Sequence, residues 1–375
     1  MPPRRFHGGG PLSPHMTRRV RTALLLLAAL PRRAASLSFY EACYLRSGSS
    51  ATSFSSTFDA DLLRFATPDG FLAYASLPPL STTVAFFDPV LAHPDDPAAA
   101  DALLSAFLRA HPRAVFLHCG ASSAALLAEK GFYINPYGVE SRVRLPISLD
   151  GARMRGVRRE VLAARRHGVC VRLVAEGERE VWRALAPVER SWRESRALRR
   201  EVRRATRRAV LAAERHTTKL VASVGGNPVG WACLDHIYER GELVGVGLAV
   251  VRADPRVPGV ATLLAADGAA ICAEAFPRLR FLDLGLSPLA PVPEGMEWNP
   301  LLVCGEEACV DAPPRAPFVD GLFRALFRWG TRLYNTPGLA AWKRKWRPDE
   351  GLAYVAVKTA LPLRELVAVL LLLMF

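Results

Sequence analysis

The fold is decided by the stretch Val251-Arg252-Ala253-Asp254-Pro255-Arg256-Val257-Pro258-Gly259, where a strand must end and a helix can begin. Residues 244–251 are rich in β-branched side chains and glycine, which favours a strand, and the two prolines prevent that strand from continuing inside a sheet. From Val260 to Phe276 the apolar residues recur at helical spacing. A helix that begins beside Gly259 directs unpaired backbone N–H groups at that turn, so we expect an anion-binding position at the edge of an active site.

A second strand follows at once and carries one acid. Residues 281–286 read Phe-Leu-Asp-Leu-Gly-Leu, with Asp283 inside an apolar run. Burying an ionised carboxylate is costly unless the group is paired or has a chemical role. Asp283 is therefore a candidate functional residue, and a structural ion pair is the alternative.

The succession strand, strand, helix, strand occurs twice along the chain. The first copy comprises expected strands at 71–75, 82–87 and 114–118 and helices at 98–110 and 122–130; the second comprises expected strands at 219–224, 229–235, 243–251 and 281–285 and the helix after Gly259. Two copies predict an α/β protein with two similar halves, 57–168 and 169–375. Further elements are expected at 318–333, 340–347 and 363–375 as helices and at 351–357 as a strand.

Composition indicates a globular protein with polyanionic partners. The 375 residues are 50% hydrophobic and carry a formal net charge of +14, which favours RNA, anionic lipid or an acidic substrate, although a genome that prefers arginine would have the same effect. The seven cysteines show no CxxC pair and no histidine at zinc spacing. We therefore expect buried free thiols, no metal and no cofactor; a Cys304–Cys309 bridge is conceivable only in an oxidising compartment.

The N-terminal residues are typical of a targeting segment. The first forty residues contain no acid and many arginines around the apolar run 23–30, which is far shorter than the roughly 20 residues needed to cross a bilayer. Residues 1–56 are thus expected to be a removable presequence followed by a serine-rich linker at 47–56. A plastid or mitochondrial location fits, a secretory route is possible, and a disordered basic extension is the alternative.

The most basic region lies between the halves, from Arg153 to Arg215. One group of arginines falls on an expected helix that ends near Gly168: Arg155, Arg158, Arg159 and Arg165. A second group, at 199–208, also has helical spacing. Such a surface can follow a phosphate backbone, and a solvated helix face is the alternative.

Several segments, taken together, resemble the C-terminal catalytic domain of phosphatidylglycerol lysyltransferases, also called multiple peptide resistance factors, from about Phe65 onward. These segments are Gly138-Val139-Glu140, the arginine helix with Gly168, Arg252-Ala253-Asp254-Pro255 with Pro258-Gly259, residues 282–289, and residues 333–339 followed by Lys343, Lys345, Trp346 and Pro348. The resemblance implies two tandem N-acetyltransferase-like (GNAT) folds joined by a basic helical connection. It also implies a reaction in which an aminoacyl group passes from charged tRNA to the hydroxyl of a lipid such as phosphatidylglycerol, at a membrane surface.

The resemblance also implies roles for individual residues. Catalytic roles fall to Asp283, Arg252, Lys343 and Glu140: the two cations would bind phosphate or stabilise an oxyanion, and the two acids would hold the amino group or orient a base. Substrate contacts fall to Lys345, Tyr334, Asn335, Asp254 and Gly259, and tRNA contacts to the arginines of the first group. Surface cations, structural ion pairs and, for Asn335, a turn are the alternatives. The amino acid and the lipid stay open.

Two other functions are consistent with the sequence. Residues 256–261 match the loose Arg-x-x-Gly-x-Ala pattern that holds a pyrophosphate at a helix N-terminus, as in acyl-CoA-dependent GNAT N-acyltransferases. A non-enzymatic module that binds RNA or anionic membrane through the basic region is the second alternative.

Overall fold

The structure, a computed structural model, describes residues 37–196, 202–293, 296, 313–329 and 335–374. Residues 1–36 of the expected presequence lie outside the described residues. So do Tyr334 and the Cys304–Cys309 pair. The residues from Leu37 onward form one compact unit.

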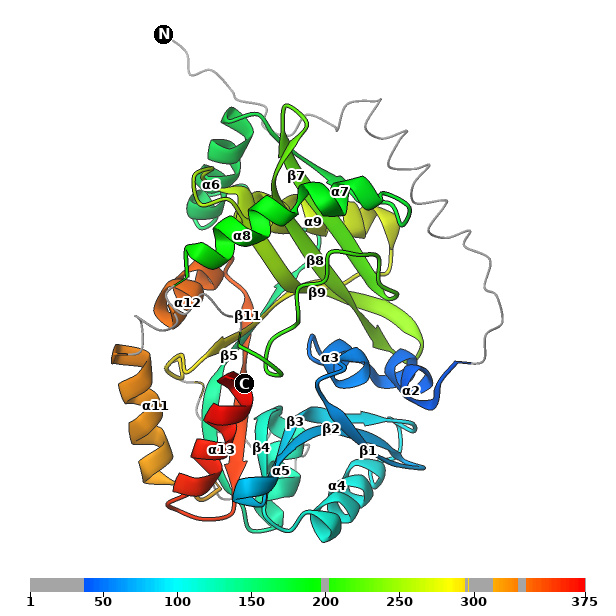
Figure 1. Ribbon diagram of the computed structural model, residues 1–375, viewed down its shortest axis with the longest axis vertical. Helices are drawn as coiled ribbons and strands as arrows, with labels where there is room; N and C mark the ends of the chain where they lie inside the picture. Colours follow the sequence, from blue (N-terminus) through cyan, green and yellow to red (C-terminus); the bar gives the residue numbers. More distant parts are fainter. Residues whose placement is uncertain (1–36, 197–201, 294–295, 297–312, 330–334, 375) are drawn as a thin grey trace. The chain divides into compact units, whose positions relative to one another are not determined.

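The first half begins with two short helices and continues with the expected α/β succession (Figure 1). Its elements are α2 (Phe39–Ser47), α3 (Ser53–Phe58), β1 (Leu63–Thr67), β2 (Gly70–Leu77), β3 (Thr82–Leu91), α4 (Ala99–Ala110), β4 (Ala114–Cys119), α5 (Ala121–Glu129) and β5 (Tyr133–Arg144), with a 3₁₀ turn at Pro78–Leu80.

The second half repeats the succession. Its elements are α6 (Arg155–Arg166), β6 (Val169–Leu173), α7 (Arg179–Ala184), α8 (Ala186–Glu194), β7 (Thr217–Val224), β8 (Asn227–Glu239), β9 (Glu242–Ala253), α9 (Val260–Ala275) and β10 (Phe281–Pro288). The chain ends with α11 (Pro317–Trp329), α12 (Thr336–Arg344), β11 (Asp349–Val357) and α13 (Leu363–Met374).

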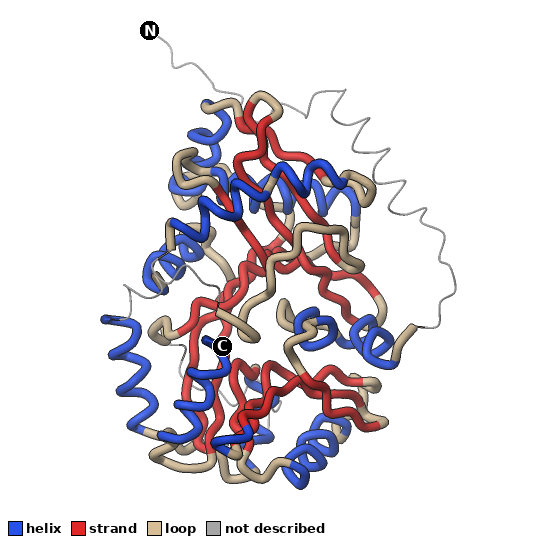
Figure 2. The backbone as a smooth tube through the Cα atoms, viewed as in Figure 1, coloured by secondary structure: helices blue, strands red, loops and turns tan. Residues whose placement is uncertain are grey.

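All the strands in the described residues belong to one 11-stranded sheet in the order β1-β2-β3-β4-β11-β5-β10-β9-β8-β7-β6. Figure 2 draws these strands in red. Its parallel pairs are β3 with β4, connected through α4, and β9 with β10, connected through α9. The remaining neighbours are antiparallel. Each half therefore has the same antiparallel strands followed by a parallel strand–helix–strand unit, and the prediction of two GNAT-like α/β halves is confirmed.

The two halves exchange strands at the centre of the sheet. β11, which belongs to the second half by sequence, lies between β4 and β5 of the first half, and β5 in turn pairs with β10 of the second half. Likewise α6, placed in the first half by sequence, packs against α9, where Val157, Val161 and Ala164 join the core of the second half. The centre of the sheet therefore combines strands from both halves.

Helices cover both faces of each half. In the first half, α4 and α5 pack on one face of the sheet, while α11 and α13 share a core cluster with β2, β3, β4 and β11 on the other. In the second half, α6 and α9 cover one face and α7 and α8 the other.

Three expectations need correction. The segment 47–56 is not a linker, because it leads from α2 into α3 and its Ser53, Ser55 and Ser56 are buried. Residues 202–208, the described part of the second arginine group, have no helical structure. α12 begins at Thr336, earlier than expected, because the Asn335 side chain accepts the Gly338 N–H at 3.0 Å and caps the helix.

Among the residues that the structure describes, no helix is both long enough and apolar enough to cross a membrane.

Candidate active site

Asp283 lies where β10 departs from regular pairing. The register between β10 and β5 shifts between Asp283 and Leu286, and Gly285 has φ of 75°, a left-handed conformation that glycine adopts without steric cost. This turn allows the Gly285 N–H to donate to Asp283 Oδ1 at 2.7 Å. The carboxylate expected from sequence to need a partner is fully buried, with 1% exposure.

Arg142 supplies the opposite charge. It lies directly across from Asp283 on β5, and its Nε donates to Asp283 Oδ2 at 2.9 Å. Burial raises the pKa of Asp283, the nearby Glu140 carboxylate raises it further, and Arg142 offsets only part of this effect. Asp283 is thus a paired acid whose proton affinity is higher than that of a free aspartate.

Lys343 approaches the same place from α12. Its side chain is buried, and Nζ donates to the Leu286 carbonyl at 2.7 Å. Burial lowers the pKa of Lys343 to about 7, although the charges of Asp283 and Glu140 favour the ammonium form. A lysine with such a pKa changes charge near neutral pH, which is typical of functional positions.

Glu140 completes the set from β5 and holds a histidine that the sequence analysis missed. His118 Nε2 lies 2.8 Å from Glu140 Oε1. Burial raises the pKa of Glu140, but attraction by His118, Arg142 and Lys343 outweighs burial and holds the pKa below its ordinary value. The ionised carboxylate only accepts hydrogen bonds, so His118 Nε2 carries the proton of this contact, and in the neutral imidazole the lone pair then lies on Nδ1.

The position of His118 is unusual in two respects. It has φ of 63°, which is uncommon for a residue other than glycine. Its Nδ1 is buried and has no hydrogen-bond partner among the described residues. Phe87 and Tyr137 border the ring, at centroid distances of 5.4 and 6.2 Å. A buried base in an apolar surrounding is suited to take a proton from a hydroxyl group.

The sequence contained a signal for both missed residues. His118 ends an expected strand, where side chains often serve function, and Arg142 follows Glu140 by two residues and so shares its face of β5. We define Asp283, Arg142, Lys343, Glu140 and His118 as the seam cluster, because they come from β10, β5, α12 and β4, where the halves exchange strands.

Arg252 and Asp254 lie elsewhere on the second half. The Arg252 guanidinium stacks over Trp192 at 3.7 Å and lies 3.5 Å from Glu189 Oε1, on the side of α8. Asp254 forms an ion pair with Arg256 at 2.6 Å. These contacts fit structural roles, and the predicted roles in catalysis and substrate binding stay predictions.

Gly259 begins α9 as expected, with φ of 77°, but α6 covers that helix end. A β-carbon at Gly259 would lie 2.1 Å from the Glu160 carbonyl oxygen. The Glu160 carboxylate also accepts the Thr262 hydroxyl at 2.5 Å. A backbone segment and an acid thus occupy the position where a pyrophosphate would bind, which argues against the acyl-CoA alternative at this helix.

Lys345 and Asn335 stabilise α12. Lys345 Nζ lies 2.5 Å from Glu160 Oε1 on α6, whereas Lys343 turns toward β10. Asn335 is the helix cap described above. Both contacts position Lys343, and substrate binding by either residue stays a prediction.

The four arginines of α6 that were predicted to contact tRNA divide into two pairs. Arg158 donates to the Leu149 carbonyl at 2.6 Å, and Arg165 pairs with Asp267 at 3.0 Å. Arg155 and Arg159 are exposed. If α6 contacts a polyanion, the exposed Arg155 and Arg159 are better placed to do so than Arg158 and Arg165.

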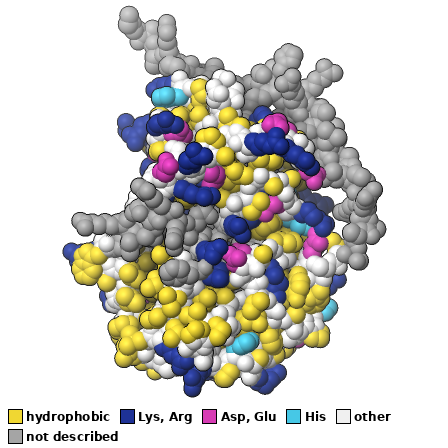
Figure 3. Space-filling view, viewed as in Figure 1, with side chains coloured by type: hydrophobic (Ala, Val, Ile, Leu, Met, Phe, Trp, Pro, Cys, Tyr) yellow, Lys and Arg dark blue, Asp and Glu magenta, His cyan; other side chains and the backbone are white. Residues whose placement is uncertain are grey.

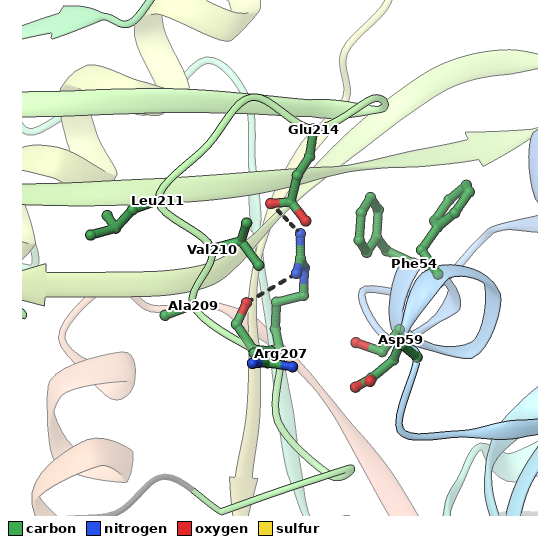
Figure 4. A pocket seen from close by; sticks show the side chains of 11 residues that line it. Phe54, Asp59, Arg207, Ala209, Val210, Leu211 and Glu214 are labelled. Carbon is green, nitrogen blue, oxygen red and sulfur yellow. Dashed lines mark hydrogen bonds and ion pairs between the residues drawn. The ribbon is translucent and has the colours of Figure 1, made fainter. Parts of the chain in front are cut away.

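A cavity of about 470 Å³ lies away from the seam cluster, between α3 and residues 207–214 (Figure 4). Arg207 in its wall pairs with Glu214 at 2.9 Å and with Asp235 at 3.1 Å. These buried charges satisfy one another, which indicates a structural role. In the part of the chain covered by the structure, no group of three His, Cys, Asp or Glu residues is arranged to hold a metal ion.

Comparison with known proteins identifies a family. Residues 42–357 match the family described as phosphatidylglycerol lysyltransferase, C-terminal. No curated protein sequence matches the chain.

Solved structures agree in fold. L-PGS from Bacillus licheniformis has a TM-score of 0.68 at 17% identity over 89% of this chain and 95% of that one. A C-terminal domain named for lysylphosphatidylglycerol synthetase, from Agrobacterium fabrum, has a TM-score of 0.60 at 19% identity over 88% of this chain and 97% of that one. At these identities the likeness establishes the fold alone.

Proposed function

Because the chain belongs to the phosphatidylglycerol lysyltransferase C-terminal family, a family of acyl-transferring enzymes, we propose that it moves an aminoacyl group, lysyl or a similar one, from charged tRNA to the hydroxyl of a lipid such as phosphatidylglycerol. The observation that supports this most strongly is the seam cluster, in which the buried His118, Asp283 and Lys343 lie beside the partly exposed Glu140 and Arg142. An aminoacyl ester is already activated, so the enzyme needs chiefly to position two substrates, accept a proton and stabilise an oxyanion.

The cluster supplies each of these functions. The oxygen of the lipid hydroxyl attacks the ester carbonyl carbon while His118 Nδ1 takes the proton of that hydroxyl. Glu140 then stabilises the imidazolium that forms. The ammonium of Lys343 stabilises the oxyanion that forms. Collapse of this intermediate expels the ribose oxygen of the tRNA, which takes the proton back from His118. Asp283 attracts the amino group of the transferred residue, and Arg142 favours the ionised form of Asp283.

The remaining partners follow from charge. Arg155 and Arg159, exposed on α6, are proposed to contact tRNA phosphates. The enzyme is proposed to work at the surface of an organelle membrane after loss of an N-terminal presequence.

The test is transfer of radiolabel. The full chain is incubated with total tRNA charged with labelled amino acids and a total lipid extract, with labelled acetyl-CoA and generic amines in parallel. Label in a lipid that disappears when the tRNA is first deacylated supports the proposal and identifies both substrates. Label only from acetyl-CoA would move the protein to the acyl-CoA-dependent class.

A further inference from the structure

α11 and α13 leave apolar side chains on the surface. Eight of the thirteen large hydrophobic side chains exposed in the described ranges lie on these helices or in the turn before α13: Phe318, Leu326, Trp329, Leu361, Leu363, Val367, Leu370 and Leu371. Figure 3 shows hydrophobic side chains gathered at the lower left, over the region where Figure 1 places the two helices. Scattered exposed residues are ordinary, but a concentration of this kind marks an interaction surface.

The helical periodicity explains the surface. In α13, Ala368, Val369 and Leu372 are buried, while Leu363, Val367 and Leu370 recur at spacings of four and three residues on the opposite face. α13 is thus apolar on its outward face as well as on the face that is covered. In α11, Val319 is buried, whereas Phe318 and Trp329 are 41% and 71% exposed.

Both helices lie on the same face of the first half. Val319 and Phe323 of α11 and Val369 and Leu372 of α13 contribute to one core cluster with β2, β3, β4 and β11. Two helices in one layer that cover the same sheet direct their outer faces to the same side. The two outward apolar faces therefore point to the same side of the sheet, and we call them together the α11–α13 face.

The charges on this face favour one occupant. Arg324, Arg328 and Arg364 are exposed, whereas Asp320 and Glu365 are partly buried. Asp320 is also held by Asn135 at 2.7 Å. An apolar face that carries an exposed tryptophan and arginines has the composition of a segment that lies in the interface of an anionic bilayer.

The α11–α13 face is also connected to the seam cluster. Phe323 on the inner side of α11 contacts Tyr137 with ring centroids 5.9 Å apart, and Tyr137 contacts His118 at 6.2 Å. The ring of His118 thus borders the apolar layer beneath α11. A lipid that reaches His118 through this layer keeps its acyl chains in apolar surroundings.

We propose that the α11–α13 face docks the protein on an anionic lipid surface and thereby presents the lipid hydroxyl to His118. The docking stands on the exposed residues themselves; only the link to His118 rests on the proposed function.

The experiment measures binding of the full chain to sedimentable vesicles of phosphatidylglycerol and phosphatidylcholine, and to phosphatidylcholine vesicles alone. The variant Leu363→Gln/Val367→Gln/Leu370→Gln removes apolar contact at positions that are already exposed, so folding is preserved. The matched control Leu63→Gln/Leu162→Gln changes exposed leucines away from the face. We expect roughly tenfold or greater loss of binding for the triple variant and little change for the control.

A second variant tests the charges. Arg324→Gln/Arg328→Gln/Arg364→Gln should weaken binding to the anionic vesicles and reduce its salt dependence, while leaving the weak binding to phosphatidylcholine unchanged. Binding that is unaffected by the apolar triple variant would overturn the proposal. So would a dimer, seen by analytical ultracentrifugation, that the same variant dissociates, because a second copy would then occupy the face.

A short-chain, water-soluble phosphatidylglycerol separates this proposal from the proposed function. The apolar triple variant should transfer label to this soluble acceptor as well as the wild type does, and lose transfer to vesicles. Vesicle binding by a wild-type protein that transfers label to neither acceptor would leave the docking proposal intact and contradict the proposed function.

Discussion

At the scale of single residues, the account depends on the charge of Lys343. Burial lowers its pKa to about 7. If the ammonium stabilises the oxyanion, kcat/KM for transfer should fall roughly tenfold per pH unit above that value. A pH–rate profile, corrected for spontaneous hydrolysis of the aminoacyl ester, checks this. Lys343→Met should lower activity and abolish this descending limb, whereas Lys358→Met, which changes an exposed lysine, should retain it. A wild-type profile that stays flat to pH 9 would exclude the role.

The same residue should make stability depend on pH. Between pH 7 and about 10.5 the unfolded chain binds the lysine proton and the folded chain does not, so the free energy of unfolding rises with pH in this window. Lys343→Met should therefore be more stable than the wild type at pH 6. We expect that advantage to shrink by on the order of 2–3 kcal/mol by pH 9. Urea titrations of both proteins at pH 6 and pH 9 measure the two free energies of unfolding. A difference between the proteins that is the same at both pH values would contradict the lowered pKa of Lys343.

His118 provides another residue-scale prediction. His118→Gln keeps a side chain that hydrogen-bonds Glu140 but removes the base, so kcat should fall about 10²–10⁴-fold with little change in KM. The control is His93→Gln, which changes an exposed histidine. A His118→Gln enzyme with near-normal kcat would show that the proton leaves by another route.

At the scale of elements, the contact between α6 and α9 can be tested at Gly259. A β-carbon there would meet the Glu160 carbonyl and would require a left-handed alanine, so Gly259→Ala should destabilise the protein by about 2–4 kcal/mol. Gly177→Ala, at a position with open space and no positive φ, should have little effect. Thermal unfolding of both variants and of the wild type measures these changes in stability. Equal stability would mean that α6 does not cover the start of α9.

The elements also show how far sequence reasoning reaches. The β-branched run at 244–251 and the prolines after it located β9 and α9 closely, because these signals are local. The serine-rich segment was misread, since burial of Ser53 and Ser56 depends on partners distant in sequence. Asp283 was singled out from the sequence because burying a carboxylate in an apolar strand is costly unless the group is paired or has a chemical role. His118 was missed because its proposed role depends on the hydrogen bond with Glu140, and these two residues come together only when β4 and β5 take their places in the sheet.

At the scale of the whole molecule, the exchange of strands couples the two halves. No local pattern could predict it, because the pairing of β11 with β4 and β5 joins residues more than two hundred positions apart. Residues 37–168, expressed alone, would leave β4 and β5 without their common neighbour. We expect this fragment to lack a cooperative thermal transition and the full chain to unfold in a single one. A fragment that melts cooperatively by calorimetry would show that the first half folds independently.

The central claim is that the seam cluster transfers an aminoacyl group from tRNA to lipid. The most direct measurement is the initial rate of that transfer for Asp283→Asn, compared with Asp267→Asn, which removes a carboxylate paired to an arginine on α6. Far-UV circular dichroism confirms that both variants are folded. The account predicts at least a hundredfold loss for Asp283→Asn and a near-normal rate for Asp267→Asn. A folded Asp283→Asn enzyme that transfers at the wild-type rate would contradict it.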